Sequence, residues 1–449
     1  MGDIRKLAAF WAMLLILVPV LAACGGGDDD DPTATSESQD TPSVTAATTG
    51  TTEADETTTT EPGGETPEAT GTSDASAETP EAVTETPGDA TSTTPPAADA
   101  TPTTPEDDPA ADFAFGWNVA LRGDDGGAEF NTMTTDMVNE SGFNWVRFQL
   151  QWSQFEREPD QWDPLGMDRV IDACFNAGIN VLLVVTAAPE WALDPTGAQM
   201  LSDWGEFEQF MNFVANRYRG KVQAWEIWNE QNLSAEMHGP VRASDYYELL
   251  KAGYTGVKSA DPEALVLFGG LSPNGLNDPN AAVDDLLYLE TIYTETNGDI
   301  SNYYDILGAH LNSTHNGPQY MWPDNPSPET GWNDDESFYF RRAEQLRAVQ
   351  LANGDSAKPM WITEFGWTTE NHAPGYEYGA NNSPEEVAEF LTLALDIAIN
   401  EWDFTTGAFI WNLNWSTLAD PEDELYPWSA IEGDWTPRPA FEAMVAYPK

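Results

Sequence analysis

The stretch that decides the fold reads AWEIWNEQN from Ala224 to Asn232, and it joins an apolar segment to a carboxylate. Its first five residues have the apolar and aromatic composition of a β-strand. An amide, Asn229, and a carboxyl group, Glu230, follow directly. A polar pair at the end of a buried strand suggests that strand ends open onto a shared site, and other strands of the chain should then end in polar residues too.

Strand-like and helix-like segments alternate along the chain from residue 113 onward. A good example of a helix is SPEEVAEFLTLALDIAINEW, which starts at Ser383 with an N-cap residue, a proline and two glutamates. Such alternation indicates a parallel sheet, and eight units in about 340 residues predict an α/β fold of the (β/α)8 TIM-barrel type. The predicted strands span residues 113–121, 145–152, 180–187, 222–228, 265–271, 305–311, 359–365 and 407–412.

An open, doubly wound sheet is the alternative to the barrel. Such a sheet is expected to carry a glycine-rich G-x-G-x-x-G turn after its first strand. The corresponding stretch here reads GWNVALRGDDGG and does not have that spacing. The barrel is therefore the preferred prediction, and it directs attention to the carboxyl ends of the strands and the loops that follow.

The first 112 residues predict two segments outside the barrel. Arg5 and Lys6 precede an apolar run that ends in Leu21-Ala22-Ala23-Cys24, which resembles the lipobox of bacterial lipoproteins. We expect residues 1–23 to be a signal peptide and Cys24 to carry lipid, with an uncleaved anchor or a plain signal peptide as alternatives. Residues 24–112 contain no aromatic, Lys or Arg residue, which predicts a disordered Thr/Pro/Glu-rich linker. The domain 113–449 would then be held at the cell surface, outside the cytoplasm, by a lipid in the membrane.

The charge balance excludes one class of partner. The chain has 76 acidic and 18 basic side chains and a net charge of −58. Nucleic acid is excluded because its phosphates are bound by Lys and Arg that displace counterions, and anionic glycans are disfavoured as the main ligand. The four histidines show neither H-x-x-x-H nor H-E-x-x-H spacing, so we expect no metal and no other cofactor.

Two carboxylates stand at the ends of opposite strands of the predicted barrel. Glu230 follows the fourth strand, and Glu364 ends the seventh in the stretch WITEFGW. Two facing carboxyl groups are what cleavage of a glycosidic bond requires, since one protonates the leaving oxygen and the other attacks the sugar. Side chains suited to binding sugar hydroxyls and the apolar faces of sugar rings lie within the predicted strands or shortly after them: Arg147, Trp152, Trp191, Asn229, His310 and Trp411.

These motifs resemble those of the clan A glycoside hydrolases, retaining (β/α)8 enzymes that include families 5 and 39. The resemblance covers residues 113–449 and rests on Trp228-Asn229-Glu230 and on Thr363 to Trp367, with support from the strand-end residues above and from TPRPAF at 436–441. It implies that Glu230 is the general acid/base and Glu364 the nucleophile. It further implies that Arg147 keeps Glu364 ionised and that Asn229 binds the 2-hydroxyl of the sugar. The expected substrate is a β-linked oligosaccharide or polysaccharide, cleaved by double displacement.

Two positions depart from the clan pattern. Asn312 stands where many members have a tyrosine that donates to the nucleophile, and Thr186-Ala187-Ala188 lacks the histidine that many carry on strand three. A catalytically impaired, carbohydrate-binding surface lipoprotein is therefore the alternative, although the presence of both glutamates argues against it. A purely structural spacer is disfavoured by the aromatic-rich strand ends. Glu226, inside strand four, is interpreted as structural, pointing into the barrel or packing against an Arg or Lys.

Overall fold

A computed structural model describes residues 112–324 and 335–449 and shows a closed barrel of parallel strands. Around the barrel the order is β1-β12-β11-β10-β7-β6-β5-β2. The prediction of a (β/α)8 barrel is confirmed, and each predicted segment overlaps one barrel strand. The strands are β1 (Ala114–Asn118), β2 (Trp145–Gln151), β5 (Asn180–Thr186), β6 (Ala224–Ile227), β7 (Leu265–Leu271), β10 (Ile306–Asn312), β11 (Met360–Gly366) and β12 (Thr405–Ile410).

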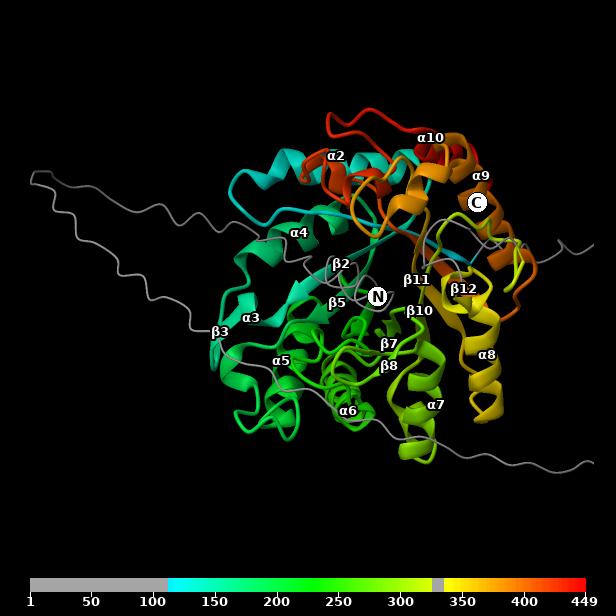
Figure 1. Ribbon diagram of the computed structural model, residues 1–449. Helices are drawn as coiled ribbons and strands as arrows, with labels where there is room; N and C mark the ends of the chain where they lie inside the picture. Colours follow the sequence, from blue (N-terminus) through cyan, green and yellow to red (C-terminus); the bar gives the residue numbers. More distant parts are fainter. Residues whose placement is uncertain (1–111, 325–334) are drawn as a thin grey trace, which may run out of the picture. The chain divides into compact units, whose positions relative to one another are not determined.

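Helices surround the strands as an outer layer (Figure 1). They are α2 (Gly127–Glu140), α4 (Leu165–Asn176), α5 (Trp204–Arg217), α6 (Ala243–Ala260), α7 (Asp285–Glu295), α8 (Arg342–Ala352), α9 (Pro384–Asn400) and α10 (Pro439–Ala446). The predicted start of α9 is confirmed by a capping box. The Glu386 N–H donates to Ser383 Oγ at 3.2 Å, and the Ser383 N–H donates to the Glu386 carboxylate at 2.9 Å.

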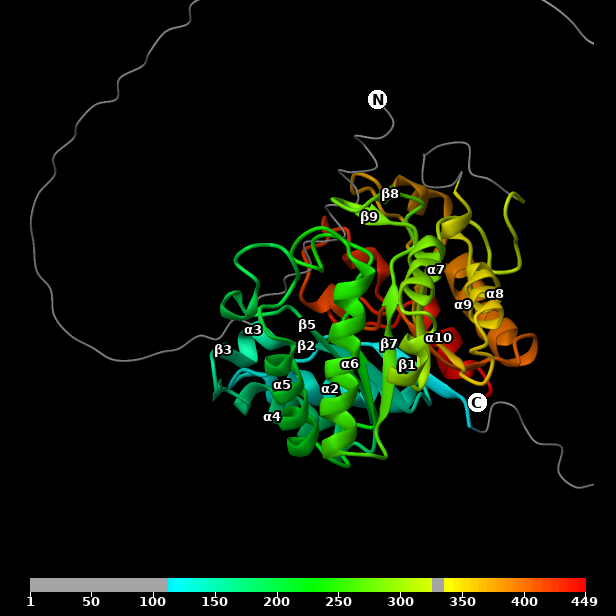
Figure 2. The same cartoon turned by 90° about the horizontal axis from the view of Figure 1, so that it is seen from below.

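Most of the short elements occupy loops at the carboxyl ends of the strands, and the β8–β9 hairpin of this set lies at the top of Figure 2. The short helices and strands are α3 (Trp152–Phe155), β3 (Glu156–Glu158), β4 (Gln161–Trp162), β8 (Asn277–Asp278) and β9 (Ala282–Val283). The 3-10 helices are η1 (Glu190–Ala192), η2 (Asp299–Tyr303), η3 (Glu336–Phe338), η4 (Glu377–Asn381), η5 (Trp415–Thr417) and η6 (Tyr426–Trp428).

Apolar side chains fill one end of the barrel interior. Seven buried residues form this plug: Ala114, Leu182, Ala224, Leu267, Ile306, Trp361 and Phe409. Six of them come from the first half of their strands, and Phe409 alone lies near the end of its strand, so the amino-terminal end of the barrel is a packed core. A larger apolar cluster lies between strands and helices. Polar chemistry is thereby confined to the opposite, carboxyl-terminal end of the barrel.

The amino-terminal predictions fall on residues that the structure does not describe. The signal peptide at 1–23, the lipidation site Cys24 and the linker up to residue 111 lie outside the described residues. Within residues 112–324 and 335–449, no helix combines the length and the apolar character needed to cross a membrane.

Candidate active site

Glu230 and Glu364 face one another across the barrel mouth. Both are nearly buried, with 6% and 5% of their surfaces exposed. One carboxylate oxygen of each lies within 4.8 Å of the other, and a ring nitrogen of His310 lies within 4.8 Å of both oxygens. A separation of about 5 Å is typical of retaining glycosidases, whereas inverting enzymes need roughly 6.5–9.5 Å for a water molecule.

The backbone turns sharply where the chain leaves β6. Trp228 and Glu230 both have positive φ angles, of 68° and 48°, which residues other than glycine rarely adopt. The Glu230 N–H donates to the carbonyl of Gly270 at 2.9 Å, and the Trp228 indole donates to the carbonyl of Glu236 at 2.9 Å. Such backbone strain concentrates at functional sites. Here the strained turn after β6 holds Glu230 at the barrel mouth.

Arg147 of β2 is the buried cation at the centre of the site. Its guanidinium donates to Glu364 at 2.6 Å, to Glu226 at 2.7 Å, to Asn118 at 2.8 Å and to the side-chain oxygen of Asn229 at 2.9 Å. Burial acts to lower the pKa of Arg147, but the attraction of Glu226 and Glu364 outweighs burial and raises it above its ordinary value. The interpretation of Glu226 as a structural residue that packs against an arginine agrees with this contact.

His310 of β10 bridges the two carboxylates. Its Nδ1 lies 3.0 Å from Glu230, and its Nε2 lies 3.6 Å from Glu364 and 3.4 Å from Arg147. A Cβ at Gly270 of β7 would lie 2.3 Å from the ring, so the glycine makes room for the imidazole. Burial acts to lower the pKa of His310, but Glu364 and Glu230 outweigh it and the pKa is raised. When His310 is neutral and its Nε2 accepts from Arg147, the ring proton lies on Nδ1, which then donates to Glu230.

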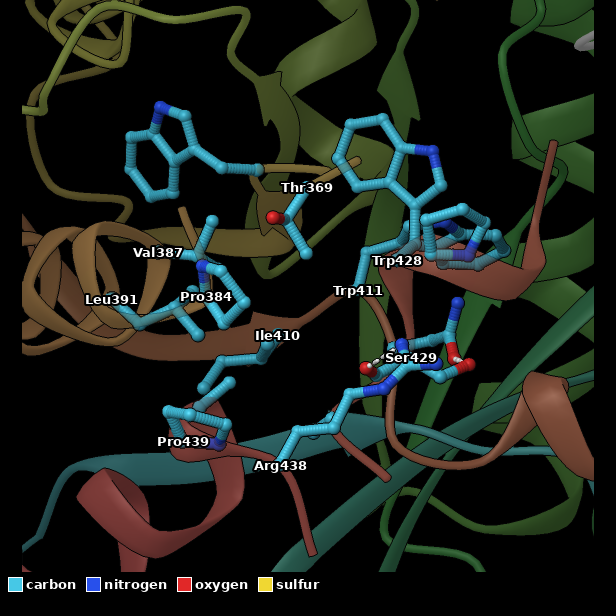
Figure 3. Close-up of a pocket in the computed structure, with 15 residues that line it drawn as sticks. Thr369, Pro384, Val387, Leu391, Ile410, Trp411, Trp428, Ser429, Arg438 and Pro439 are labelled. Carbon is cyan, nitrogen blue, oxygen red and sulfur yellow. Dashed lines mark hydrogen bonds between the residues drawn. The ribbon is translucent and has the colours of Figure 1, made fainter. Parts of the chain in front are cut away.

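Trp411 follows the barrel strand that neighbours β11, the strand of Glu364. It follows β12, and the carbonyl of Trp411 would lie 2.6 Å from a Cβ at Gly366, two residues after Glu364. Its indole packs in a cluster with Tyr376, Tyr378 and Trp428. Figure 3 shows Trp411 and Trp428 close together beside a cavity of about 20 Å³. That cavity has room for about one water molecule, so it is not a substrate site.

Trp152 is a correction to the predicted sugar-binding set. The side chain is fully buried, at 0% exposure, because β2 ends at Gln151 and the chain turns into α3. Its ring packs on Phe207 and Phe210, with centroids 5.3 and 5.4 Å away, and its indole donates to Glu156 at 2.7 Å. No face of the ring is left for a ligand, so the prediction that Trp152 binds sugar is wrong.

Trp191 is placed less decisively. It lies in η1 after β5 and keeps a partly exposed side chain. Its indole donates to the Glu156 carbonyl at 3.1 Å, and its ring packs edge-on against Trp152 at 5.6 Å. These contacts anchor it to the α3–β3 segment and not to the carboxylate pair. Its role in sugar binding stays a prediction.

Asn312 behaves differently from the tyrosine found at its position in many clan members. It ends β10 and is buried, yet neither polar atom of its side chain has a hydrogen-bond partner in the described part of the chain. Asn312 therefore does not donate to Glu364. In this structure the polar support of Glu364 comes from Arg147, with His310 at longer range.

Three further residues belong to the site and were not predicted from the sequence. Asn118 ends β1 and binds Arg147, so the rule that strand ends carry the site could have found it. Tyr376 and Glu236 lie within long loops, where no sequence pattern marks them. Burial raises the pKa of Glu236 to about 8, and Glu230 and Glu364 add to the shift. Glu236 is thus a third carboxyl group near the pair, one that keeps its proton at neutral pH.

A metal ion has an unfavourable environment at this site. Glu230, His310 and Glu364 are close enough to act as three ligands. However, the Arg147 guanidinium already contacts Glu364 at 2.6 Å and faces His310 Nε2 at 3.4 Å. A cation bound there would be repelled by a buried positive charge. The expectation of no metal and no cofactor stays a prediction.

A (β/α)8 barrel that presents two facing carboxylates at its mouth defines a protein of the glycoside hydrolase class. Comparison with known families agrees. Residues 115–408 match the family described as cellulase, glycosyl hydrolase family 5. This match covers more than half of the chain, and the chain belongs to that family.

Individual relatives are distant. A family 39 glycoside hydrolase from the gut symbiont Bacteroides cellulosilyticus WH2 is 18% identical with a TM-score of 0.53, over 76% of this chain and 64% of that one. A GH5_18 protein from Streptomyces cattleya, in complex with GlcNAc, is 17% identical with a TM-score of 0.52, over 75% and 80%. At such identities the likeness concerns the fold alone.

One curated protein is similar over a short segment. Endo-1,4-beta-xylanase 2 from Claviceps purpurea is 38% identical over 74 residues, which are 15% of this chain and 21% of that protein. The matched segment thus spans about a fifth of the relative's length.

Proposed function

We propose that the protein is a retaining glycoside hydrolase that cleaves β-linked oligosaccharides or polysaccharides by double displacement. The observation that carries this proposal is the pair Glu230 and Glu364, with carboxylate oxygens within 4.8 Å of one another. That separation leaves no space for a water molecule between the carboxyl groups and the sugar, as inversion would require. Membership of glycosyl hydrolase family 5 supports the same reaction.

Each residue of the site has a distinct part in the proposed reaction. Arg147 stabilises the negative charge of Glu364, which attacks the anomeric carbon while Glu230 protonates the departing oxygen. The resulting glycosyl ester on Glu364 is then hydrolysed by a water molecule that gives its proton to Glu230. His310 orients Glu230 through the 3.0 Å contact. Asn229 has its oxygen occupied by Arg147, so its NH₂ group is the part that donates to a sugar hydroxyl.

The β-linkage and the glycan class are supported by the names of the matched family and of one relative. The family description refers to cellulase, and the short match is to an endo-1,4-beta-xylanase, both names of enzymes for β-linked chains. Trp411 follows the strand next to β11, and the apolar face of an indole ring suits the C–H face of a pyranose ring. We therefore place β-xylan and β-glucan first among the candidate substrates.

The test is an assay of the full chain on β-linked xylan, glucan, mannan and galactan and on aryl β-glycosides, with early products followed by proton NMR. We expect sugar release in which the first product is the β anomer, since two displacements restore the original configuration. An initial α anomer would contradict the double displacement. Binding of a glycan by calorimetry without release of sugar would favour the catalytically impaired binding protein.

We also propose that Cys24 anchors the protein to the membrane through lipid and places the barrel at the cell surface. The Leu21-Ala22-Ala23-Cys24 sequence supports this proposal. A Cys24→Ala variant expressed in a bacterial host should leave the membrane fraction, whereas Cys174→Ala should stay there. Cys174 is the matched control because it is a buried free cysteine of the barrel domain. Equal membrane association of both variants would contradict lipidation at Cys24.

A further inference from the structure

Two loops from different parts of the barrel bring polar side chains towards Glu230. Glu236 lies in the loop between β6 and α6, the same loop that begins at Glu230. Tyr376 lies in the loop between β11 and α9. The charge of Glu230 raises the pKa of both groups, so both side chains lie within electrostatic reach of the proposed acid/base.

The backbone around Glu236 is fixed beside the catalytic turn. The Trp228 indole, which is fully buried, donates to the carbonyl of Glu236 at 2.9 Å. The Leu233 N–H donates to the carbonyl of Glu230 at 2.9 Å, and the Met237 N–H donates to the carbonyl of Leu233 at 3.2 Å. Glu236 is therefore held next to Glu230 by its backbone, and its side chain is not needed for that purpose.

The carboxyl group of Glu236 is an unpaired donor. It is partly exposed, and it makes no hydrogen bond or ion pair with any residue of the described part of the chain. Partial burial raises its pKa to about 8, and the charges of Glu230 and Glu364 add to the rise. At neutral pH the group is therefore an uncharged carboxyl with an O–H to donate.

The hydroxyl of Tyr376 is a second unpaired donor. Its ring is 4% exposed and packs in the cluster with Trp411, Trp428 and Tyr378. The hydroxyl has no hydrogen-bond partner among residues 112–324 and 335–449, and unlike the sealed hydroxyl of Tyr288 it keeps contact with solvent. Burial raises the pKa of Tyr376 well above its ordinary value, so the hydroxyl keeps its proton. Packing thus fixes the ring while the O–H stays available to a ligand.

Both donors lie on the side of the site where the leaving group departs. In the proposed reaction Glu230 protonates the oxygen of the leaving sugar, so that sugar lies next to Glu230. Glu230 raises the pKa of Glu236 more than Glu364 does, and of the two only Glu230 is among the main influences on the pKa of Tyr376. Polar groups that are largely buried normally have hydrogen-bond partners, so unpaired donors beside a reaction centre indicate partners that a substrate supplies. Sugar hydroxyls offer such acceptors, whereas an apolar alcohol offers none.

We infer that Glu236 and Tyr376 bind the leaving-group sugar, each by donating a hydrogen bond to one of its hydroxyl oxygens. The inference rests on the proposed glycosidase function and deepens it by naming the class of leaving group, a hydroxyl-bearing sugar unit. The bond cleaved is still the glycosidic bond held between Glu230 and Glu364. The two donors make the enzyme prefer bonds between sugars over glycosides of apolar alcohols.

The experiment compares two substrates that share one glycone, a β-linked disaccharide and the cyclohexyl β-glycoside. Glucosyl and xylosyl glycones are both used. The two leaving alcohols are of similar basicity and need the same protonation by Glu230, so the ratio of their kcat/KM values reports contacts to the leaving-group hydroxyls. We expect the full chain to favour the disaccharide. Tyr376→Phe removes only the hydroxyl and should lower the ratio about tenfold, a usual size for one lost hydrogen bond.

Two variants of Glu236 test the carboxyl group. Glu236→Leu removes the donor and should lower the same ratio about tenfold. Glu236→Gln puts an amide N–H where the carboxyl O–H stood and should keep most of the preference for the disaccharide. A loss in Glu236→Gln as large as that in Glu236→Leu would overturn the role of Glu236 as a neutral donor.

Tyr288→Phe is the matched control, because Tyr288 of α7 is another buried tyrosine whose hydroxyl has no partner in the described part of the chain. It should keep the full ratio, and Tyr376→Phe should unfold at the same temperature as the parent. Equal kcat/KM for both substrates in the parent, or an unchanged ratio in both Tyr376→Phe and Glu236→Leu, would overturn the inference. Equal losses on the two substrates would also overturn it, because they would show that these residues only hold Glu230 in place.

A binding measurement distinguishes failure of this inference from failure of the proposed function. Calorimetry with Glu364→Gln measures affinity without turnover. If the parent cleaves neither substrate, the proposed function fails, yet tighter binding of the disaccharide than of the cyclohexyl glycoside, lost on adding Tyr376→Phe, would still support the binding of a sugar by Tyr376. Cleavage of both substrates with equal kcat/KM and equal affinities would leave the function standing and remove the assignment of Glu236 and Tyr376.

Discussion

Replacement of Glu364 by alanine is expected to lower kcat by at least about 10⁴-fold on every substrate that the parent cleaves. The carboxylate is the proposed nucleophile, and without it no glycosyl ester forms. Glu364 lies nearly buried at the end of β11, paired with Arg147 at 2.6 Å. The variant keeps the Arg147–Glu226 ion pair at 2.7 Å, so we expect the barrel to fold. Steady-state kinetics on an aryl β-glycoside measure the loss.

Azide separates a lost nucleophile from general damage to the site. A small anion can enter the space left by the Glu364 side chain and attack the anomeric carbon directly, forming a C–N bond as the C–O bond breaks. One displacement inverts the centre, so we expect an α-glycosyl azide from an aryl β-glycoside. Glu263→Ala, at an exposed glutamate, is the matched control and should keep full activity. Loss of activity in the control, or no rescue with a fully folded variant, would contradict the assignment.

The barrel could be predicted from the sequence because each strand and each helix has its own local pattern of residues. The strands from Asn180 and Leu265 are continuous apolar runs, and α9 begins with a proline and a capping box. Residues at strand ends could be predicted as well, because closure of the barrel brings those ends together whatever the loops do. Four residues predicted from the strand pattern lie in one hydrogen-bonded group: Arg147, Glu230, His310 and Glu364.

Loops and side-chain direction could not be predicted in the same way. Trp152 directly follows a strand, but the chain turns into α3 and the ring enters the layer between strand and helix. A shift of one residue past a strand end reverses the direction of a side chain, and no local pattern fixes that step. Glu236 and Tyr376 reach the site from long loops. Their positions depend on packing between segments far apart in the chain.

Replacement of Arg147 by methionine should lower both activity and stability. The change removes a buried cation from between Glu226 and Glu364, which are 0% and 5% exposed. An uncompensated buried charge costs about 3–5 kcal/mol of the free energy of unfolding. Urea titrations measure this loss. The control variant Arg169→Met removes an ion pair that is exposed to solvent on both sides and should cost under about 1 kcal/mol.

The double variant Arg147→Met/Glu226→Gln separates the structural part of Arg147 from its part in the reaction. Removing the Glu226 charge takes away one of the two unpaired carboxylates, so part of the lost stability should return. Activity should not return, because Glu364 still lacks the cation that aims it and stabilises its charge. We expect kcat to stay about 10³-fold below the parent, a loss comparable to that of one preorganised electrostatic contact at an active site. Recovery of kcat together with stability would show that Arg147 only holds the barrel mouth together.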